Sequence, residues 1–408
     1  MVNLGYNKHY TLQYLITPER SIRITTYAIF FMIMVLPLVM LFVFKLFRME
    51  PAESYSDFLE KKVVNKDNTK LFVVLVVVTI IQLALLIIYL RAIGYVPIVK
   101  LFTGNDGFDY SIERQRIAAI SFGGKLDLIM SLLLFMAQPL VSYIAFAYAL
   151  SNKKASWGVL AAVAIIISII IETRNFSKSP LIFHFAIYLL IVIYHKKGVR
   201  NWIMVLFAAL CVCILMFYYR VEGYEGSFTD IYNGILGRTL FTQFGTLCYH
   251  FDLFPEEFPF LKGRSLYPTI LRLLGRDPEE HLRSSRLVME YYGSKHVYAG
   301  TAGVMNANFI GEAYANWGNL GLIFSVVWVA VVISLIFILI LKMRKTPSTI
   351  AFLAAMTVTI GNATQGGFVD FIYSSSLIMK ILIFMIFIYP DKVVQPFKFI
   401  FSRRKRTA

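Results

Sequence analysis

A carboxylate and three amides recur at helical spacing just before a long apolar segment. The polar stripe consists of Asn308, Glu312, Asn316 and Asn319, at steps of four, four and three residues. A carboxylate there can act as a general base towards a hydroxyl group, or it can pair with a cation, because an isolated charge in an apolar setting is costly. The spacing therefore predicts either a wet cavity or a polar contact between helices.

A second stripe on the same predicted helix contains only small residues. It consists of Ala307, Gly311, Ala315 and Gly318. Small residues let another helix approach closely, which is the usual packing device in membranes. This pattern predicts that the helix packs deep against its neighbours and holds Glu312 at the edge of a cavity.

Basic residues supply the complementary chemistry. In ETRNFSKSP, a short segment between two apolar blocks, Arg174 and Lys178 stand four residues apart. An arginine offers a bidentate fork to phosphate and a lysine offers a point charge, so the pair could bind phosphate groups. The alternative is that both side chains only extend to lipid headgroups.

The long segment from Arg220 to Gly318 is rich in arginine and tyrosine. Most of these residues fit an interfacial belt, which polytopic membrane proteins commonly have. Arg238 is a stronger binding candidate, because GILGRTLFTQFG reads as a largely apolar helix in which an unpaired guanidinium is costly. Arg264, in KGRSLYPTIL, is a further candidate for holding phosphate.

Several side chains in this segment could act as a general base. They are His250 and Asp252 in CYHFD, and Glu280 and His281 in EEHLRSSR. Each such residue is more often a solvated or capping residue. The cysteines Cys211, Cys213 and Cys248 form no metal-binding or disulfide pattern and are expected to be packing residues, so neither a metal nor a cofactor is predicted.

Composition indicates the elements that position these residues. The chain has 408 residues, is 58% hydrophobic and only 16% charged, and its apolar residues occur in blocks long enough to cross a bilayer. We predict an all-α polytopic membrane helix bundle of about 9 to 11 transmembrane helices with one large periplasmic loop region. The expected spans are 27–44, 71–90, 126–150, 157–171, 181–194, 202–219, 320–341, 349–360 and 377–389, and the stretch 91–125 could hold a re-entrant or interfacial piece.

Charge and topology complete the expectation. The net charge of +16 fits loop topology and anionic lipid, and no nucleic-acid partner is expected. If the tail KFIFSRRKR is cytoplasmic, the other short basic loops fall on the same side and the long segment faces the opposite side. The predicted ranges are an N-terminal transmembrane bundle at 1–219, a large periplasmic loop with interfacial helices at 220–318, and C-terminal helices with a basic cytoplasmic tail at 319–408.

These motifs together resemble a family of bacterial membrane enzymes. GEAYANWGNLG just before a span, TRNFSKSP between spans, KGRSLYPTIL in a large loop, the chain length and the span count resemble the oligosaccharide repeat-unit polymerases of the Wzy type. The resemblance implies a multi-pass inner-membrane glycosyltransferase. Such enzymes join undecaprenyl-diphosphate-linked oligosaccharides into O-antigen, capsule or common antigen at the periplasmic face, with a chain-length-regulating co-polymerase as a partner.

The resemblance also implies roles for particular residues. Arg174 and Arg238 would hold the diphosphate, with Lys178 and Arg264 beside them, and Glu312 would be the acid of the motif, with Asn308 and Asn316 binding substrate. The related ligases carry a histidine shortly before their comparable glycine pair, whereas this chain has MNAN there. The base therefore stays open among His250, His281, His296 and Glu312.

Two other classes of protein remain as alternatives. A polysaccharide flippase or other secondary transporter would also carry polar residues in its spans, and GNATQGGFVD, ending at Asp370, is typical of a broken helix. Against this, transporters usually contain two related halves, and no repeat is visible here. A structural membrane protein would not need Glu312 and Arg238 in apolar settings.

Overall fold

The described part of the chain is helical throughout. The computed structural model describes residues 11–65, 69–103, 108–221, 227, 230, 232, 234–300 and 302–388, and within these ranges it contains helices and no strand. The all-α prediction is therefore confirmed. The side chains of Arg238 and His296 lie outside what is described.

Eight helices in the described ranges are long and apolar enough to cross a membrane. They occupy Pro18–Leu46, Thr69–Ile93, Gly124–Asn152, Ala155–Glu172, Lys178–Lys196, Asn201–Val221, Phe309–Lys342 and Val369–Ile386. A shorter apolar helix, Pro347–Ala363, contains the remaining predicted span, 349–360. Every span expected from sequence thus overlaps one of these helices, and the polytopic membrane class is confirmed.

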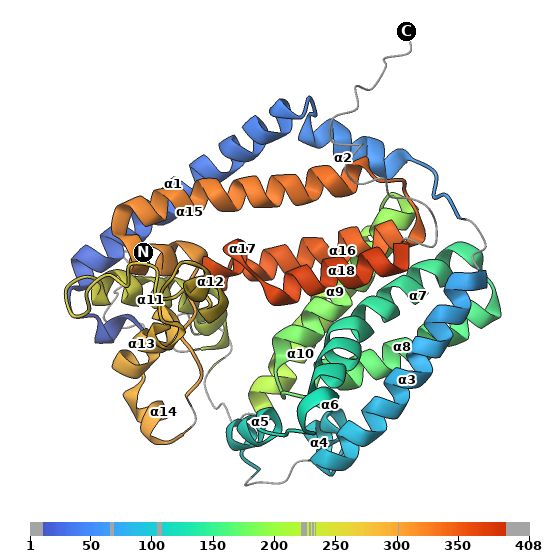
Figure 1. Ribbon diagram of the computed structural model, residues 1–408, viewed down its shortest axis with the longest axis horizontal. Helices are drawn as coiled ribbons and strands as arrows, with labels where there is room; N and C mark the ends of the chain where they lie inside the picture. The colour runs from blue at the N-terminus through green and yellow to red at the C-terminus, as the bar shows by residue number, and fades with distance from the viewer. Residues whose placement is uncertain are drawn as a thin grey trace. The chain divides into compact units, whose positions relative to one another are not determined.

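The chain divides into two compact units, the first of which is formed by Met1–Arg48, Gly223–Leu335 and Ile360–Ser374. In this unit, α1 (Pro18–Leu46) runs along α11 (Ile235–Leu253), and α13 (Ser284–Tyr292) packs on α11 (Figure 1). The unit also contains α12 (Pro268–Leu273), α14 (Ser294–Tyr298), α17 (Val369–Ile372) and the first part of α15 (Phe309–Lys342). Helix α11 is not among the long apolar spans.

The second unit consists of Met49–Glu222, Ile336–Thr359 and Ser375–Ala408. Its helices α3 (Thr69–Ile93), α7 (Gln138–Asn152) and α8 (Ala155–Glu172) lie side by side (Figure 1). The unit also holds α2 (Pro51–Glu60), α6 (Gly124–Ile129), a π-helical stretch (Met130–Ala137), α9 (Lys178–Lys196), α10 (Asn201–Val221), most of α16 (Pro347–Ala363) and α18 (Ser375–Ile388).

Two short helices, α4 (Pro97–Thr103) and α5 (Tyr110–Ala118), occupy the stretch between α3 and α6. Arg114 of α5 donates to the carbonyl oxygens of Asn175 and Phe176, both at 2.9 Å, and so ties this stretch to the turn between α8 and α9. Neither helix is long enough to cross a bilayer, so this stretch adds no span.

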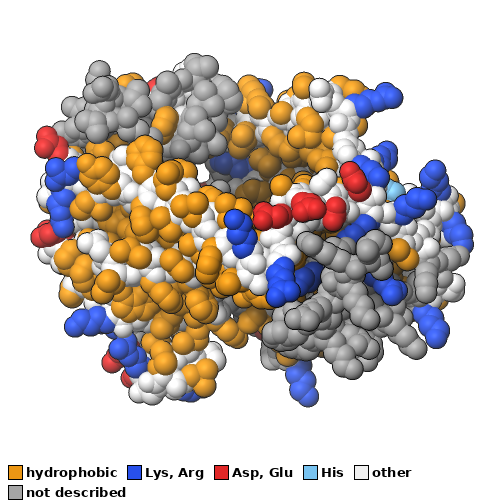
Figure 2. Space-filling view, turned by 90° about the horizontal axis from the view of Figure 1, so that it is seen from above, with side chains coloured by type: hydrophobic (Ala, Val, Ile, Leu, Met, Phe, Trp, Pro, Cys, Tyr) orange, Lys and Arg blue, Asp and Glu red, His pale blue; other side chains and the backbone are white. Residues whose placement is uncertain are grey.

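Hydrophobic side chains cover broad areas of the face seen in Figure 2. Among the described residues many large hydrophobic side chains are exposed, including Phe30 and Leu38 of α1 and Ile80 of α3, as expected for helices whose outer surfaces contact lipid. The two compact units group chain segments that are distant in sequence. The three ranges 1–219, 220–318 and 319–408 stay a prediction.

Candidate functional site

The helix that carries the polar stripe is broken in the middle. In α15, Trp317 has φ −136° and ψ 17°, and Gly318 has φ 61° and ψ −146°, a conformation that glycine adopts far more readily than other residues. Glu312 and Asn316 precede the break and are buried, whereas Asn319 follows it and is exposed. Glu312 and Asn316 therefore lie on one regular helical segment, as expected, whereas Asn308 precedes the helix and the expected stripe is wrong at Asn319, because the helix does not continue regularly.

The break frees backbone carbonyl groups, and a loop binds them. The amide of Leu261 donates to the Ala315 carbonyl and the amide of Lys262 donates to the Asn316 carbonyl, both at 2.9 Å. A helix end needs such partners because its last carbonyls have none within the helix. The loop that supplies them begins the KGRSLYPTIL motif, so two of the motifs noticed in the sequence are in direct contact.

The Asn316 side chain completes this contact. Its Oδ1 accepts from the Gly263 amide at 3.0 Å, and its Nδ2 donates to the Glu312 carbonyl at 2.8 Å and to the Ser265 hydroxyl. Asn316 is fully buried. Its observed role is to hold the loop, and the predicted role in substrate binding stays a prediction.

Glu312 is a buried carboxylate with one satisfied oxygen. Its side chain is only 4% exposed, and Oε2 accepts from the Val369 amide at 3.1 Å. The other oxygen, Oε1, is buried and has no hydrogen-bond partner among the described residues. Because a buried polar atom without a partner is costly, a further hydrogen-bond donor at Oε1 would be favourable.

The backbone opposite Glu312 must be glycine. A Cβ atom added to Gly367 would lie 2.1 Å from Glu312 Oε2, closer than real Cβ contacts. The adjacent turn is held by Asp370, whose Oδ2 accepts from the Gly367 amide at 3.2 Å and whose Oδ1 accepts from the Tyr267 hydroxyl at 2.8 Å. The GNATQGGFVD segment, predicted as a break in a helix, does separate α16 from α17 and presents its backbone to Glu312.

Charged and titratable neighbours surround this site. Burial, together with the hydrogen bond to Asp370, raises the pKa of Tyr267 to about 12. The charge of Glu312 also raises this pKa, whereas the charge of Arg283 lowers it. Tyr267 is therefore protonated at neutral pH and donates its hydrogen to Asp370. Arg283 is the cation near this group of acids, and it interacts electrostatically with Glu312 as well.

Gly311, one member of the small-residue stripe, packs against α11. A Cβ atom at Gly311 would lie 2.9 Å from Leu247 Cδ1 and 3.3 Å from His250 Cγ. His250 is only 1% exposed, and its Nδ1 lies 2.9 Å from the Thr246 carbonyl oxygen, so Nδ1 carries the hydrogen. Burial lowers the pKa of His250 to about 4. The histidine proposed as a base is thus neutral and packed between two helices.

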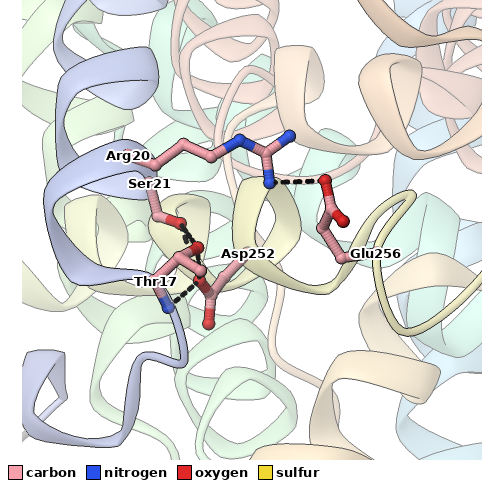
Figure 3. Close-up of polar contacts among 5 residues, drawn as sticks. All are labelled: Thr17, Arg20, Ser21, Asp252 and Glu256. Carbon is pink, nitrogen blue, oxygen red and sulfur yellow. Dashed lines mark hydrogen bonds and ion pairs between the residues drawn. The ribbon is translucent and has the colours of Figure 1, made fainter.

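Asp252 has a different role from the one considered for it. It accepts from the Thr17 amide at 2.9 Å and from the hydroxyls of Thr17 and Ser21, both at 2.7 Å (Figure 3). It also accepts from the Tyr292 hydroxyl at 2.7 Å. Although burial opposes ionisation, hydrogen bonds from Ile16, Ser21, Thr17 and Tyr292 outweigh it, and the pKa of Asp252 is lowered. Its oxygens are engaged in fastening the start of α1 to α11 and α13.

The remaining candidates in this unit lie around the same region. His281 is half-buried and its Nδ1 donates to the Leu266 carbonyl at 2.9 Å. Arg264 is half-buried with Nε 3.4 Å from the Leu261 carbonyl oxygen, and Asn308, just before α15, donates to Met32 Sδ at 3.4 Å. Nothing is described for the side chains of His296 and Arg238.

Arg174 and Lys178 belong to the second unit. Arg174 donates through Nη1 to the Ile171 carbonyl at 2.8 Å, and its guanidinium carbon lies 4.7 Å from the Phe135 ring centre. Lys178, the first residue of α9, places Nζ 3.7 Å from the ring centre of Tyr219. Both cations therefore lie on aromatic faces at the turn between α8 and α9, an arrangement that stabilises a positive charge at a membrane boundary.

Metal chemistry has no visible site in the part of the chain that is described. No cluster of three or more histidine, cysteine, aspartate or glutamate side chains is suitable for a metal ion there. The three cysteines are free, with Cys248 buried in α11 and Cys211 and Cys213 on α10.

Sequence reasoning missed several residues around Glu312. Ser265, Tyr267, Arg283 and Gly367 were not singled out as site residues, and Asp370 was noted only for the transporter alternative. Their positions depend on contacts between segments far apart in sequence, and only the paired glycines before Asp370 carried a local signal. Comparison with protein-family models, curated proteins and solved structures finds no match for this chain.

Proposed function

We propose that the chain is a membrane glycosyltransferase that polymerises undecaprenyl-diphosphate-linked oligosaccharide repeat units at the periplasmic face of the bacterial inner membrane. The observation that supports this proposal is the Glu312 carboxylate. It is held rigidly by the Val369 amide and by packing against Gly367, while Oε1 has no partner among the described residues. A sugar hydroxyl is a donor of the size and chemistry that this oxygen needs.

The proposed reaction is a displacement at the anomeric carbon of the growing chain. A hydroxyl oxygen of the incoming unit forms the new glycosidic bond, the bond from the anomeric carbon to the lipid diphosphate breaks, and Glu312 takes the hydroxyl proton. The diphosphate leaves with its electron pair. Guanidinium and ammonium groups stabilise phosphate charge, and the assignment of Arg174, Lys178, Arg238 and Arg264 to the diphosphate stays a prediction from the sequence.

The test uses purified protein in proteoliposomes with lipid-linked repeat units. Glu312→Gln preserves shape and can still accept from the Val369 amide, but it cannot take a proton. We expect it to reduce chain extension by a factor of roughly 100 or more. Glu290→Gln is the matched control, because Glu290 is a half-exposed residue of the same unit that pairs with Arg286 at 2.7 Å.

Wild-type extension by Glu312→Gln, with the control also active, would rule out the catalytic role of this carboxylate. If Glu312 serves only to pair with Arg283, the variant should instead lose stability, because one buried partner is left alone. A compensating change at Arg283 should then restore expression without altering chain length.

A transporter remains the second candidate because the helical structure is interrupted at two places. One is the break in α15 at Trp317 and Gly318, and the other is the segment that joins α16 to α17. Broken helices near a membrane often form substrate sites in secondary transporters. The same proteoliposomes separate the two functions. Movement of lipid-linked units across the bilayer without any increase in their length would favour the transporter and contradict the polymerase.

A further inference from the structure

An exposed apolar pair lies at the C-terminal end of α12 in the first unit. Leu273 is 81% exposed and Leu274 is 61% exposed, and they are flanked by the exposed cations Arg272 and Arg276. Two neighbouring leucines exposed to this extent on an ordered element mark a surface that a partner covers. The flanking arginines indicate that this partner also carries negative charge.

The exposure of this pair is not a result of local fraying. The Leu274 amide donates to the Ile270 carbonyl at 3.0 Å, and the Arg276 amide donates to the Leu271 carbonyl at 2.9 Å. On the inner side, Leu271 is fully buried and packs with Leu266 and Val369. The segment is therefore amphipathic, with one side fixed in the unit and the other directed outwards.

The segment is also connected to the point where α15 begins its lipid-facing part. Arg276 Nη1 donates to the Lys262 carbonyl at 2.6 Å, and the next residue, Gly263, lies between Arg276 and Trp317. A Cβ atom there would be 3.5 Å from Trp317 Cζ2 and 3.6 Å from Arg276 Nη1.

Immediately after Trp317, α15 exposes apolar side chains. Leu320 is 78% exposed and Phe324 is 54% exposed, on a helix long and apolar enough to cross a bilayer. Tryptophan is enriched at membrane–water boundaries, where its apolar ring and polar nitrogen suit both sides. Trp317 therefore marks the level of the interface, and Arg276 is placed at that level.

We propose that the segment Pro268–Arg276 is an interfacial anchor, with Leu273 and Leu274 inserted at the boundary between headgroups and acyl chains of the bilayer that α15 crosses. The occupant of this surface is the lipid bilayer itself, and Arg272 and Arg276 lie at the level of anionic headgroup phosphates. A short apolar face flanked by cations is the usual form of such an anchor.

This anchor lies close to the site of Glu312. Leu271 packs on Val369, and the Val369 amide binds Glu312 Oε2. Contact with lipid would thus hold the backbone that orients the carboxylate. The anchor itself does not depend on the reaction proposed above.

The test places single spin labels on the full chain in vesicles of phosphatidylethanolamine and phosphatidylglycerol. Cys211, Cys213 and Cys248 are first replaced by alanine, and cysteine is introduced in separate proteins at Leu273, Leu320 and Glu290. Leu320 is the lipid reference, since it is exposed on a predicted span, and Glu290 is the water reference. The measurement is the accessibility of each label to oxygen, which concentrates in lipid, and to a nickel chelate, which stays in water.

We expect the label at Leu273 to behave like the one at Leu320, with greater accessibility to oxygen than to nickel. Behaviour like that of Glu290 would overturn the proposal. If the Leu273 label became lipid-like only after addition of undecaprenyl diphosphate, the pair would be a site for the substrate's tail, which also contradicts a bilayer anchor. None of these readings requires polymerisation, so failure of the proposed reaction would leave the result unaffected.

Discussion

At the scale of single residues, the Glu312 carboxylate combines two properties that rarely coincide. It is nearly inaccessible, and one of its oxygens has no partner among the described side chains and amides. A purely structural carboxylate would be expected to resemble Asp252, which is saturated with hydrogen bonds from α1 and α13. Within one unit, Asp252 is thus a carboxylate that holds helices together, whereas Glu312 has an oxygen that can accept a hydrogen bond from a ligand.

The close approach of Gly367 to Glu312 gives a first residue-level prediction. Gly367→Ala should push the carboxylate aside, because the new Cβ would begin 2.1 Å from Oε2. We expect chain extension to fall by a factor of ten or more, a cost of about 1.4 kcal/mol or greater in positioning. Gly361→Ala is the matched control, since a Cβ there meets nothing within 4 Å. Equal chain lengths from the two variants would mean that Glu312 needs no fixed position.

His250 gives a prediction about pH. Its pKa falls from 6.5 to about 4 on burial, so between these values the unfolded chain binds a proton that the folded chain does not. The free energy of unfolding should therefore decrease as pH falls from 6.5 towards 4, by up to about 3 kcal/mol.

Thermal unfolding in detergent across this pH range measures the effect. His250→Gln should reduce the pH dependence of the free energy of unfolding by the part that this imidazole contributes. If the pH dependence of unfolding were the same in this variant as in the wild type, His250 would not be its cause.

At the scale of elements, the start of α1 depends on Asp252. Asp252→Asn removes a charged acceptor from several buried hydrogen bonds, and we expect a loss of about 1–3 kcal/mol in the free energy of unfolding. Glu256→Gln, in the turn that follows α11, should cost less than about 1 kcal/mol, because its pair with Arg20 at 2.9 Å is partly exposed. Denaturant titration followed by intrinsic fluorescence compares the two. A larger loss from Glu256→Gln would contradict the anchoring role of Asp252.

The positions of the helices could be predicted from the sequence, because apolar blocks define them. The contacts around Glu312 could not be predicted. The step-of-four spacing correctly placed Glu312 and Asn316 on one buried helical segment. It failed at Asn319, because Gly318 stops the helix and the loop at Leu261 and Lys262 binds the freed carbonyls. That loop is more than fifty residues away in sequence, and no periodic pattern indicates such pairing.

At the scale of the whole molecule, the multi-span class could be derived from composition alone, because few charges and long apolar blocks admit no other class. The division into two units could not. Each unit draws on segments separated by more than a hundred residues, such as Met1–Arg48 and Gly223–Leu335, and long-range packing is not written in local composition. The reaction, the membrane and the orientation stay predictions.

Orientation is open to a direct measurement. Because the short basic loops are expected to be cytoplasmic, the segment from Arg220 to Gly318 should face the periplasm. A cysteine at Gly293 in a cysteine-free background should react with an impermeant thiol reagent in intact cells, whereas one at Thr407 should react only after lysis. The reverse pattern would place the C-terminus outside and contradict the periplasmic site.

The break at Gly318 has a mechanical consequence. A continuous helix transmits any tilt along its whole length, but here the dihedral angles of Trp317 and Gly318 interrupt the rod between Asn316 and Leu320. Bilayers of different thickness tilt spanning helices by different amounts. We expect Gly318 to absorb that rotation, so that the geometry around Glu312 is insulated from the thickness of the bilayer in which the protein resides.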